Sequence, residues 1–276
     1  MTGDRVRGCG LKVAIFLGAV VVLTAGIVVV VVLTRSPVRT PGCTVALPGE
    51  NATAYTFTPE QMNNAATISA VGAKLGLPPH AATVALATAL QESKLRNLEG
   101  GDRDSVGLFQ QRPSQGWGTV AQLRDPVYAA TEFYEKLEKL PNWETLPITE
   151  AAQAVQRSGV PDAYAQWEPQ SRTMAAAFTG QFPAALTCRN LTLAAPADVA
   201  AAATEELGTA RLSGAHPAAQ GWTYASWLVG RAEALGVDKV SFAGQTWTAE
   251  AGAWAPDAAA GPDLSLHQAP APPPSQ

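Results

Sequence analysis

Charged side chains are scarce in this sequence: Asp, Glu, Lys and Arg make up 15% of the 276 residues, against about 25% in a typical soluble domain. The net charge of −4 provides no basic surface for nucleic acid. The 24 glycines and 21 prolines stay below the share of roughly 25–30% that marks a low-complexity chain. Composition therefore argues against a nucleic-acid partner and excludes a collagen, a coiled coil and a wholly disordered chain. It leaves a globular protein with one strongly apolar segment.

Signatures of nucleophilic, metal-dependent and nucleotide chemistry are also missing. The sequence contains no G-x-S-x-G, no phosphate-binding loop and no dinucleotide fingerprint. Its three histidines (His80, His216 and His267) are far apart and lack H-x-x-x-H spacing, which argues against a zinc site. We therefore expect no cofactor and no metal. Carboxylates remain as the catalytic resource.

Residues 13–33 form one long apolar run without a charged side chain. As a helix, this run matches the hydrocarbon core of a bilayer, roughly 30 Å thick. A cleaved signal peptide is the alternative, but its apolar region is about 7–15 residues long and ends in small residues. Here the run ends in Leu33-Thr34-Arg35-Ser36-Pro37. We predict an uncleaved transmembrane helix over 13–33, with residues 1–12 in the cytoplasm.

The cysteines indicate on which side of the membrane the rest of the chain lies. Cys9 precedes the apolar run, whereas Cys43 and Cys188 follow it and frame the predicted helical domain. Two buried free thiols are the alternative to a disulfide. A disulfide suits an oxidising compartment, and closing so long a loop would stabilise the fold by about 5 kcal/mol in the chain-entropy model. We predict a Cys43–Cys188 disulfide and a single-pass cell-membrane protein whose domains are extracytoplasmic.

Beyond the apolar run, residues 34–57 contain three prolines and no helical periodicity, which predicts a linker. Residues 58–188 carry repeated helix signals and no convincing strand. Thr58-Pro59-Glu60-Gln61 is typical of a capping box with proline at the first helical position. Asp125-Pro126 is a second cap. Helices are expected at 58–76, 80–96, 126–140, 149–158 and from 162 onward, with an interruption at Pro169.

The sequence after Cys188 predicts a small α/β accessory domain over residues 189–257. Helices are expected at 198–207 and 222–235, and two short strands around Ala243-Gly244. Trp222-Thr223-Tyr224-Ala225-Ser226-Trp227-Leu228-Val229, with Leu235-Gly236-Val237 and Trp247, faintly resembles the last part of actinobacterial zinc peptidases of the D-Ala-D-Ala carboxypeptidase type. The metal ligands of those enzymes are missing here, so the segment is at most a wall-binding module or one that binds envelope protein partners. Core packing is the plainer interpretation of its tryptophans. Residues 258–276, rich in proline and alanine, are predicted to be a disordered tail.

Glu92 lies at the end of the apolar helix predicted at 80–96, just before a glycine-rich loop. A carboxyl against apolar walls has a raised pKa and can serve as a general acid. An ordinary solvated glutamate near a helix end is the alternative interpretation of its position.

Two short motifs around this glutamate carry a family resemblance. Gln91-Glu92-Ser93, followed by Ser105-Val106-Gly107-Leu108-Phe109-Gln110-Gln111 and then Pro113, resembles the lytic transglycosylases of the lysozyme-like superfamily. The resemblance covers residues 58–188, about half of the chain. It implies a mainly α, lysozyme-like domain in which Glu92 is the catalytic acid. Gly107–Gln110 would close the substrate cleft, with Phe109 in place of the family's Met.

One family segment is altered: Ala-Tyr-Asn-Ala-Gly corresponds to Ala154–Ser158, which lacks the Tyr, and Tyr164 is a possible substitute. For Trp117, loop packing is as plausible as sugar stacking. Asp102 and Asp104 fit a solvated turn better than a second catalytic carboxylate. The expected substrate-binding residues are Ser93, Ser105, Gly107, Phe109, Gln110, Gln111, Trp117, Gln156 and Tyr164.

The sequence thus predicts a mainly α protein with a transmembrane helix, a lysozyme-like domain and a small α/β domain. The resemblance implies a peptidoglycan lytic transglycosylase that cleaves glycan strands between N-acetylmuramic acid and N-acetylglucosamine with Glu92 as acid and base. A hydrolytic muramidase is a close alternative. A catalytically weak wall-binding or scaffold protein is an alternative of another class.

Overall fold

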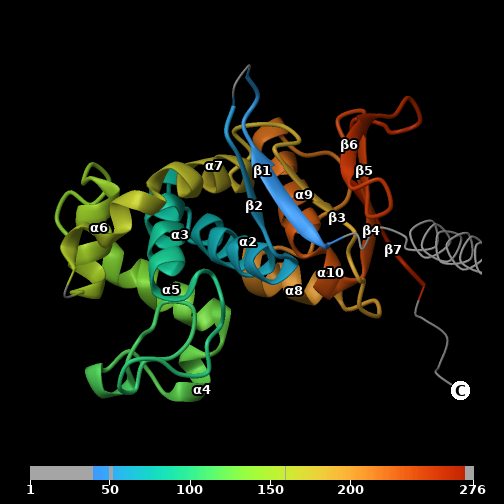
Figure 1. The fold of residues 1–276 in the computed structure, drawn as a ribbon. Coiled ribbons are helices and arrows are strands. Elements are labelled where there is room, and N and C mark those ends of the chain that lie inside the picture. Colours follow the sequence, from blue (N-terminus) through green and yellow to red (C-terminus); the bar gives the residue numbers. More distant parts are fainter. Residues whose placement is uncertain (1–39, 50–51, 159, 271–276) are drawn as a thin grey trace, which may run out of the picture. The chain divides into compact units, whose positions relative to one another are not determined.

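The computed structural model describes residues 40–49, 52–158 and 160–270. The predicted transmembrane helix at 13–33, residues 1–12, which are predicted to be cytoplasmic, and the last six residues lie outside this part. Within the part of the chain that is described, no helix is long and apolar enough to cross a membrane. The fold combines helices with two small antiparallel sheets (Figure 1).

Helix α3 (Pro79–Ser93) is the centre of the helical part, because every residue from Ala81 to Leu90 is buried. Such a helix, apolar on all sides, must be surrounded by other helices. It packs against α2 (Pro59–Lys74), α5 (Pro126–Leu137), α6 (Ile148–Gln156) and α7 (Glu168–Phe178). Shorter helical segments complete this part: η1 (Pro113–Gln115), α4 (Val120–Leu123) and η2 (Pro161–Trp167).

The predicted helix starts are confirmed in atomic detail. Thr58 and Gln61 form the reciprocal capping box of α2, with Pro59 in the first turn. The Asp125 side chain accepts hydrogen bonds from the backbone N–H groups of Val127 and Tyr128 at the start of α5. The helix expected from residue 162 is 3-10 in its first part, η2, and becomes α-helical at Glu168.

A three-stranded sheet corrects two sequence predictions. Two of its strands, β1 (Gly42–Ala46) and β2 (Ala54–Phe57), lie within the predicted linker 34–57. The third strand is β3 (Leu186–Arg189), and the order in the sheet is β2-β1-β3. The linker prediction is therefore wrong for these strands, as is the absence of strands before Cys188. The prolines at 41 and 48 flank β1 without interrupting it. As predicted, Cys43 and Cys188 form a disulfide, and they are directly opposite in the β1–β3 pairing.

The second sheet has the order β6-β5-β4-β7 and is wholly antiparallel. The predicted hairpin is β4 (Val237–Phe242) and β5 (Gln245–Thr248), joined by Ala243 and Gly244 at positive φ (52° and 74°). Strands β6 (Ala253–Pro256) and β7 (Ser265–Gln268) complete it. The prediction of a disordered tail from residue 258 is wrong for β7, which pairs with β4 and follows the buried Leu264.

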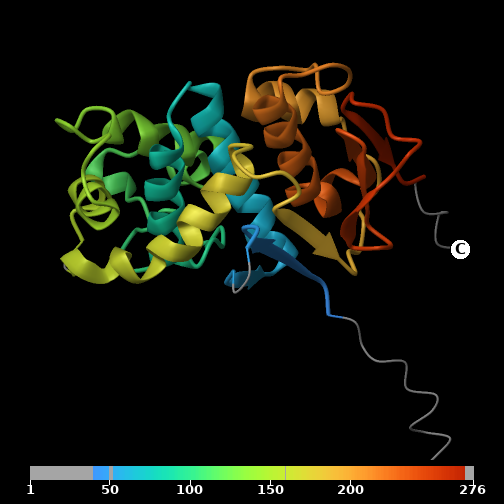
Figure 2. The ribbon, with the colours of Figure 1, turned by 90° about the horizontal axis from the view of Figure 1, so that it is seen from above.

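The described residues from Pro41 onward form one compact unit. The predicted domain boundary after residue 188 falls inside β3, and α9 (Ala218–Gly230) packs against α2, α7, β3 and β4. Helix α8 (Val199–Leu207) packs against α2, and α10 (Ala232–Leu235) packs against α2, α9 and β4. In Figures 1 and 2, the three-stranded sheet lies between the group of helices from α3 to α7 on one side and the four-stranded sheet on the other. The tryptophans of α9 and β5 are buried, as the core-packing interpretation predicted.

A buried ion pair lies where the helices after residue 188 pack against α2. The Glu206 carboxylate of α8 accepts hydrogen bonds from Trp227 Nε1 (2.7 Å) and pairs with the Arg231 guanidinium (2.9 Å). Arg231 also donates to Asn63 Oδ1 of α2 at 2.7 Å. Burial raises the pKa of Glu206, against the lowering effect of Arg231. The helices after residue 188 are thus fixed to α2 by polar contacts as well as apolar ones.

Candidate active site

Glu92 is the last but one residue of α3, where the helix ends in a fixed turn. Lys94 and Leu95 both have positive φ, 58° and 59°. Their backbone N–H groups donate to the carbonyls of Leu90 and Ala89, and the fully buried Leu95 side chain packs in the core. Such left-handed endings satisfy the last carbonyls of a helix. The turn therefore places Glu92 at a defined point at the edge of the core.

The Glu92 carboxyl has one short partner, the Tyr164 hydroxyl, which donates to Glu92 Oε1 at 2.7 Å. Burial is the largest influence on this carboxyl and raises its pKa, while hydrogen bonds from Tyr164 and Gln156 and the charge of Lys94 act in the opposite direction. The net effect is a raised pKa. A carboxyl in such a site keeps its proton to a higher pH than a solvated glutamate does, which suits a general acid.

Segment η2 contains Tyr164, and two further residues of η2 form hydrogen bonds with Gln91, the residue before Glu92. Gln91 Oε1 accepts a hydrogen bond from Trp167 Nε1 at 2.7 Å and a longer one from Gln166 Nε2 at 3.3 Å. Lys94 Nζ lies 4.1 Å from the centroid of the Trp167 ring. The roles of Gln166 and Trp167 could not be found from the sequence, because nothing in their spacing marks them as neighbours of α3.

The loop over residues 105–111 is tied to the end of α3 as the paired motifs suggest. Ser93 Oγ donates to the Leu108 carbonyl at 2.7 Å. Gly107 has φ of 79°, and a Cβ there would lie 2.2 Å from the Leu123 carbonyl oxygen. Only glycine fits this close approach. Phe109 is fully buried and stacks on Phe133, with the ring centroids 4.8 Å apart.

The structure separates the predicted substrate-binding residues into two groups. Ser93, Ser105, Phe109 and Gln111 are buried, and Gln111 Nε2 donates to the Ala129 carbonyl. These side chains hold the loop in place. Gln110 and Gln156 are partly exposed, whereas Tyr164 is fully buried and contacts Glu92 through its hydroxyl. Trp117 is 7% exposed and lines a pocket.

Gln156 connects the loop, the acid and that pocket. It is the last residue of α6, and its Nε2 donates to the Phe109 carbonyl at 2.6 Å. A hydrogen bond from the same side chain lowers the pKa of Glu92. Gln156 also lines the pocket. One side chain from the altered Ala154–Ser158 segment thus contacts all three parts of the site.

The nearby aspartates are engaged elsewhere, as the turn interpretation predicts. Asp104 accepts from Arg112 Nε at 2.8 Å and from the Ser114 backbone N–H at 2.7 Å. The Ser114 and Arg112 hydrogen bonds hold its pKa well below the usual range. Asp102 is exposed and lies 3.9 Å from Arg103. In the described part of the chain, no group of three His, Cys, Asp or Glu side chains is placed to hold a metal ion.

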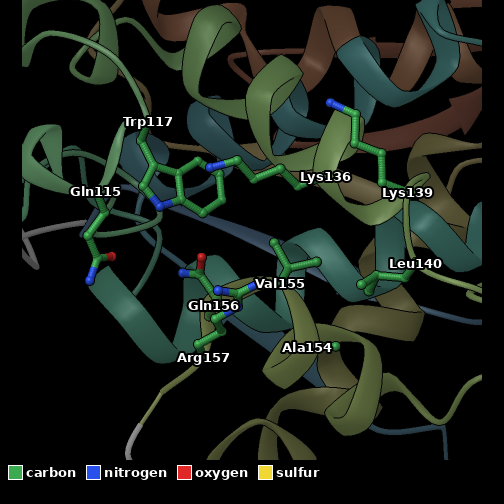
Figure 3. Close-up of a pocket in the computed structure, with 9 residues that line it drawn as sticks. All are labelled: Gln115, Trp117, Lys136, Lys139, Leu140, Ala154, Val155, Gln156 and Arg157. Carbon is green, nitrogen blue, oxygen red and sulfur yellow. The ribbon is translucent and has the colours of Figure 1, made fainter.

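The pocket has a volume of about 650 Å³ and lies between α5, α6 and the loop that carries Trp117. Figure 3 shows Lys136 reaching over the Trp117 indole, with the side chains of Gln156 and Arg157 across the same space. Lys136 Nζ is 2.9 Å from the centroid of the Trp117 ring. The remaining lining residues are Gln115, Lys139, Leu140, Ala154 and Val155. Nothing in the sequence marks Lys136, Lys139 and Arg157 as neighbours.

Comparison with protein-family models finds no family that matches this chain, and comparison with curated proteins finds no matching relative. The assignment of a function therefore rests on the geometry of the site.

Proposed function

We propose that the chain is a membrane-anchored peptidoglycan lytic transglycosylase with a lysozyme-like fold. Residues 13–33 would be the anchor, and the compact unit would face the cell wall outside the cytoplasm. The observation that carries the proposal is the Glu92 carboxyl, with its raised pKa and the Tyr164 hydroxyl 2.7 Å away. The Gly107–Gln110 loop, tied to the same helix end through Ser93, supports it.

In the proposed reaction, Glu92 acts first as an acid and then as a base. The protonated carboxyl gives its proton to the glycosidic oxygen, and the bond from that oxygen to C1 of the muramyl residue breaks. The acetamido group of the same sugar stabilises the positive charge at C1. The 6-hydroxyl oxygen then bonds to C1, and its proton passes to the Glu92 carboxylate. The product carries a 1,6-anhydro ring, and no water is consumed.

A single carboxylate suffices for this chemistry, and the surroundings of Glu92 agree with it. Two-carboxylate glycosidases pair their acid with a second carboxylate at about 5–9.5 Å. Within the described residues, the charge that acts on the pKa of Glu92 is that of Lys94, a cation. Of the two aspartates considered in the sequence, Asp104 is held by Arg112 and Ser114, and Asp102 lies beside Arg103.

Tyr164 takes the place of the tyrosine missing from Ala154–Ser158 in this proposal. Burial and the charge of Glu92 raise its pKa, so the hydroxyl stays protonated and remains a donor. It positions the Glu92 carboxyl, while Gln110, Gln156 and Trp117 are the residues left to contact the glycan.

Mass spectrometry of the products from purified peptidoglycan tests the proposal. The full chain should release anhydro-ended muropeptides, and Glu92→Gln should release none. Glu144→Gln is the matched control, because Glu144 is exposed and follows Trp143, which lies beside His80 at the opposite end of α3 from Glu92. Products heavier by one water would indicate a muramidase instead. No Glu92-dependent product across a range of pH would reject the enzyme and favour a scaffold protein.

A further inference from the structure

The pocket beside Gln156 gathers positive charge in a chain whose net charge is −4. Lys136, Lys139 and Arg157 all line it. In the described part of the chain, none of the three forms an ion pair with a carboxylate. Burial lowers the pKa of Lys136, and the charges of Lys139 and Arg157 lower it further, against the opposing field of Glu132. Lys139 and Arg157 are therefore both close enough to Lys136 to repel its charge.

The Trp117 ring provides one wall of this space. Lys136 lies against the face of the ring, and the Tyr128 hydroxyl donates to the Trp117 carbonyl at 3.3 Å, which fixes the backbone there. An aromatic wall with cations and amide groups around it is typical of sites for a partly apolar, anionic ligand. The volume of about 650 Å³ is in the usual range for ligand pockets, about 300–1,000 Å³.

We propose that this pocket binds the carboxylates of the acidic peptide stem carried by the muramyl residue at the cleavage site. The inference rests on the proposed function, because the stem is attached to the sugar whose C1 would react at Glu92. Gln156 provides the structural link, since it donates a hydrogen bond to the loop over residues 105–111 and also lines the pocket. Where the lactyl carboxyl of the muramyl residue is joined to a stem by an amide bond, the glycan chain itself is neutral, so the anionic groups are those of the stem.

Binding measurements on the full chain with Glu92→Gln, which cannot turn over, test this assignment. The probes are a muramyl disaccharide with a free-acid tetrapeptide stem and the same compound with its stem carboxylates amidated. Calorimetry should show about tenfold tighter binding of the acid form, because charge-assisted hydrogen bonds are lost on amidation. The preference should weaken as salt is added. Equal binding of the two probes would overturn the proposal.

The double variant Arg157→Gln, Lys139→Gln should remove the preference, whereas Lys239→Gln should keep it, because Lys239 is an exposed cation on β4. Thermal unfolding shows whether each variant is folded. A preference that survives in a folded double variant would place the stem elsewhere and reject the pocket. A third probe is a disaccharide that carries a phosphate ester and no peptide. If this probe bound in a way that required the cations and the acid-stem probe did not, the stem would be rejected as the ligand of the pocket.

Cleavage assays separate failure of the pocket from failure of the proposed function. With Glu92 intact, the double variant should cleave glycan whose stem carboxylates are amidated at the wild-type rate and lose about tenfold in kcat/KM on acid-stem glycan. Glu92-dependent cleavage without any stem preference would reject the pocket alone. Cation-dependent stem binding without cleavage would reject the enzyme and leave the pocket as a wall-binding site.

Discussion

The Tyr164 hydroxyl lies 2.7 Å from Glu92 Oε1 and donates to it, although the two residues are 72 positions apart in the chain. This hydrogen bond favours the ionised carboxylate, whereas burial of Glu92 favours the protonated acid. The two effects together set how strong an acid Glu92 is.

Tyr164→Phe should therefore change the pH dependence of cleavage as well as its rate. Loss of the hydrogen bond raises the pKa of Glu92 further, so the protonated acid persists to higher pH. The basic limb of the kcat profile should move to higher pH, and kcat should fall about tenfold because the carboxyl loses a positioning partner. The measurement is kcat against pH on purified peptidoglycan.

Tyr134→Phe is the control, since Tyr134 is buried and its hydroxyl donates to the Ile68 carbonyl. It should lower stability by about 1–3 kcal/mol, because that carbonyl loses its buried donor, and should leave the pH profile in place. An unchanged profile in Tyr164→Phe would mean that Tyr164 has no influence on the acid.

Glu92→Gln should make the folded chain more stable at neutral pH. The folded-state pKa of Glu92 is raised, so its contribution to stability is fully present below the ordinary glutamate pKa of about 4.3 and is lost as pH rises through the folded-state pKa. Glutamine keeps an oxygen for the Tyr164 hydroxyl without a charge. Urea unfolding should show a gain at pH 7 that disappears below about pH 4. If the difference in stability between Glu92→Gln and the wild type did not depend on pH, or if Glu144→Gln showed the same pH dependence, the raised pKa of Glu92 would not be its cause.

Gly107→Ala should disturb the loop over residues 105–111. A methyl group there would meet the Leu123 carbonyl oxygen at 2.2 Å, and alanine disfavours φ of 79°. Left-handed φ alone costs about 1–2 kcal/mol, and the clash should bring the total loss in the free energy of unfolding to about 3 kcal/mol or more. Denaturant titration and the cleavage rate measure the two consequences.

Gly116→Ala separates the two causes, because Gly116 has φ of 75° and nothing within 4 Å of the added Cβ. It should cost about 1–2 kcal/mol and leave cleavage close to the wild-type rate. Equal losses in both variants would show that the approach to Leu123 has no influence.

Local sequence signals were enough to locate many of these elements. The capping residues Thr58 and Asp125, and the Ala243-Gly244 turn, act through neighbours two or three positions away, so their effect can be predicted without the fold. The position of Glu92 at the end of a buried helix was predictable for the same reason. The link between Ser93 and Leu108 was suggested only through the paired motifs of the resemblance.

Long-range contacts account for what the sequence could not predict. Strand β1 pairs with β2, which follows it in the chain, and also with β3, which is more than a hundred residues away. No local signal could therefore predict the complete three-stranded sheet. Trp117, Lys136 and Arg157 come together from three separate segments, and no periodicity relates them. The buried pair of Glu206 and Arg231 is similar, because a glutamate in an alanine-rich helix is expected to face solvent.

That pair leads to the last prediction: Glu206→Gln should destabilise the whole compact unit. The Glu206 side chain is 5% exposed and Arg231 16%, so the substitution leaves a largely buried guanidinium without its counter-charge. Breaking a buried pair from one side costs about 3–5 kcal/mol. The loss should appear in a single cooperative transition that includes both halves, because α8 and α9 are fixed to α2 through these residues.

Glu205→Gln is the matched control, since Glu205 is exposed on the same helix, and it should change stability by no more than about 0.5 kcal/mol. Adding Arg231→Met to Glu206→Gln removes the unpaired charge, so the double variant should be less destabilised than the sum of the two single variants. Additive losses would show that the two groups do not interact. Separate transitions for the helical part and for the second sheet would show that the chain after residue 188 folds on its own.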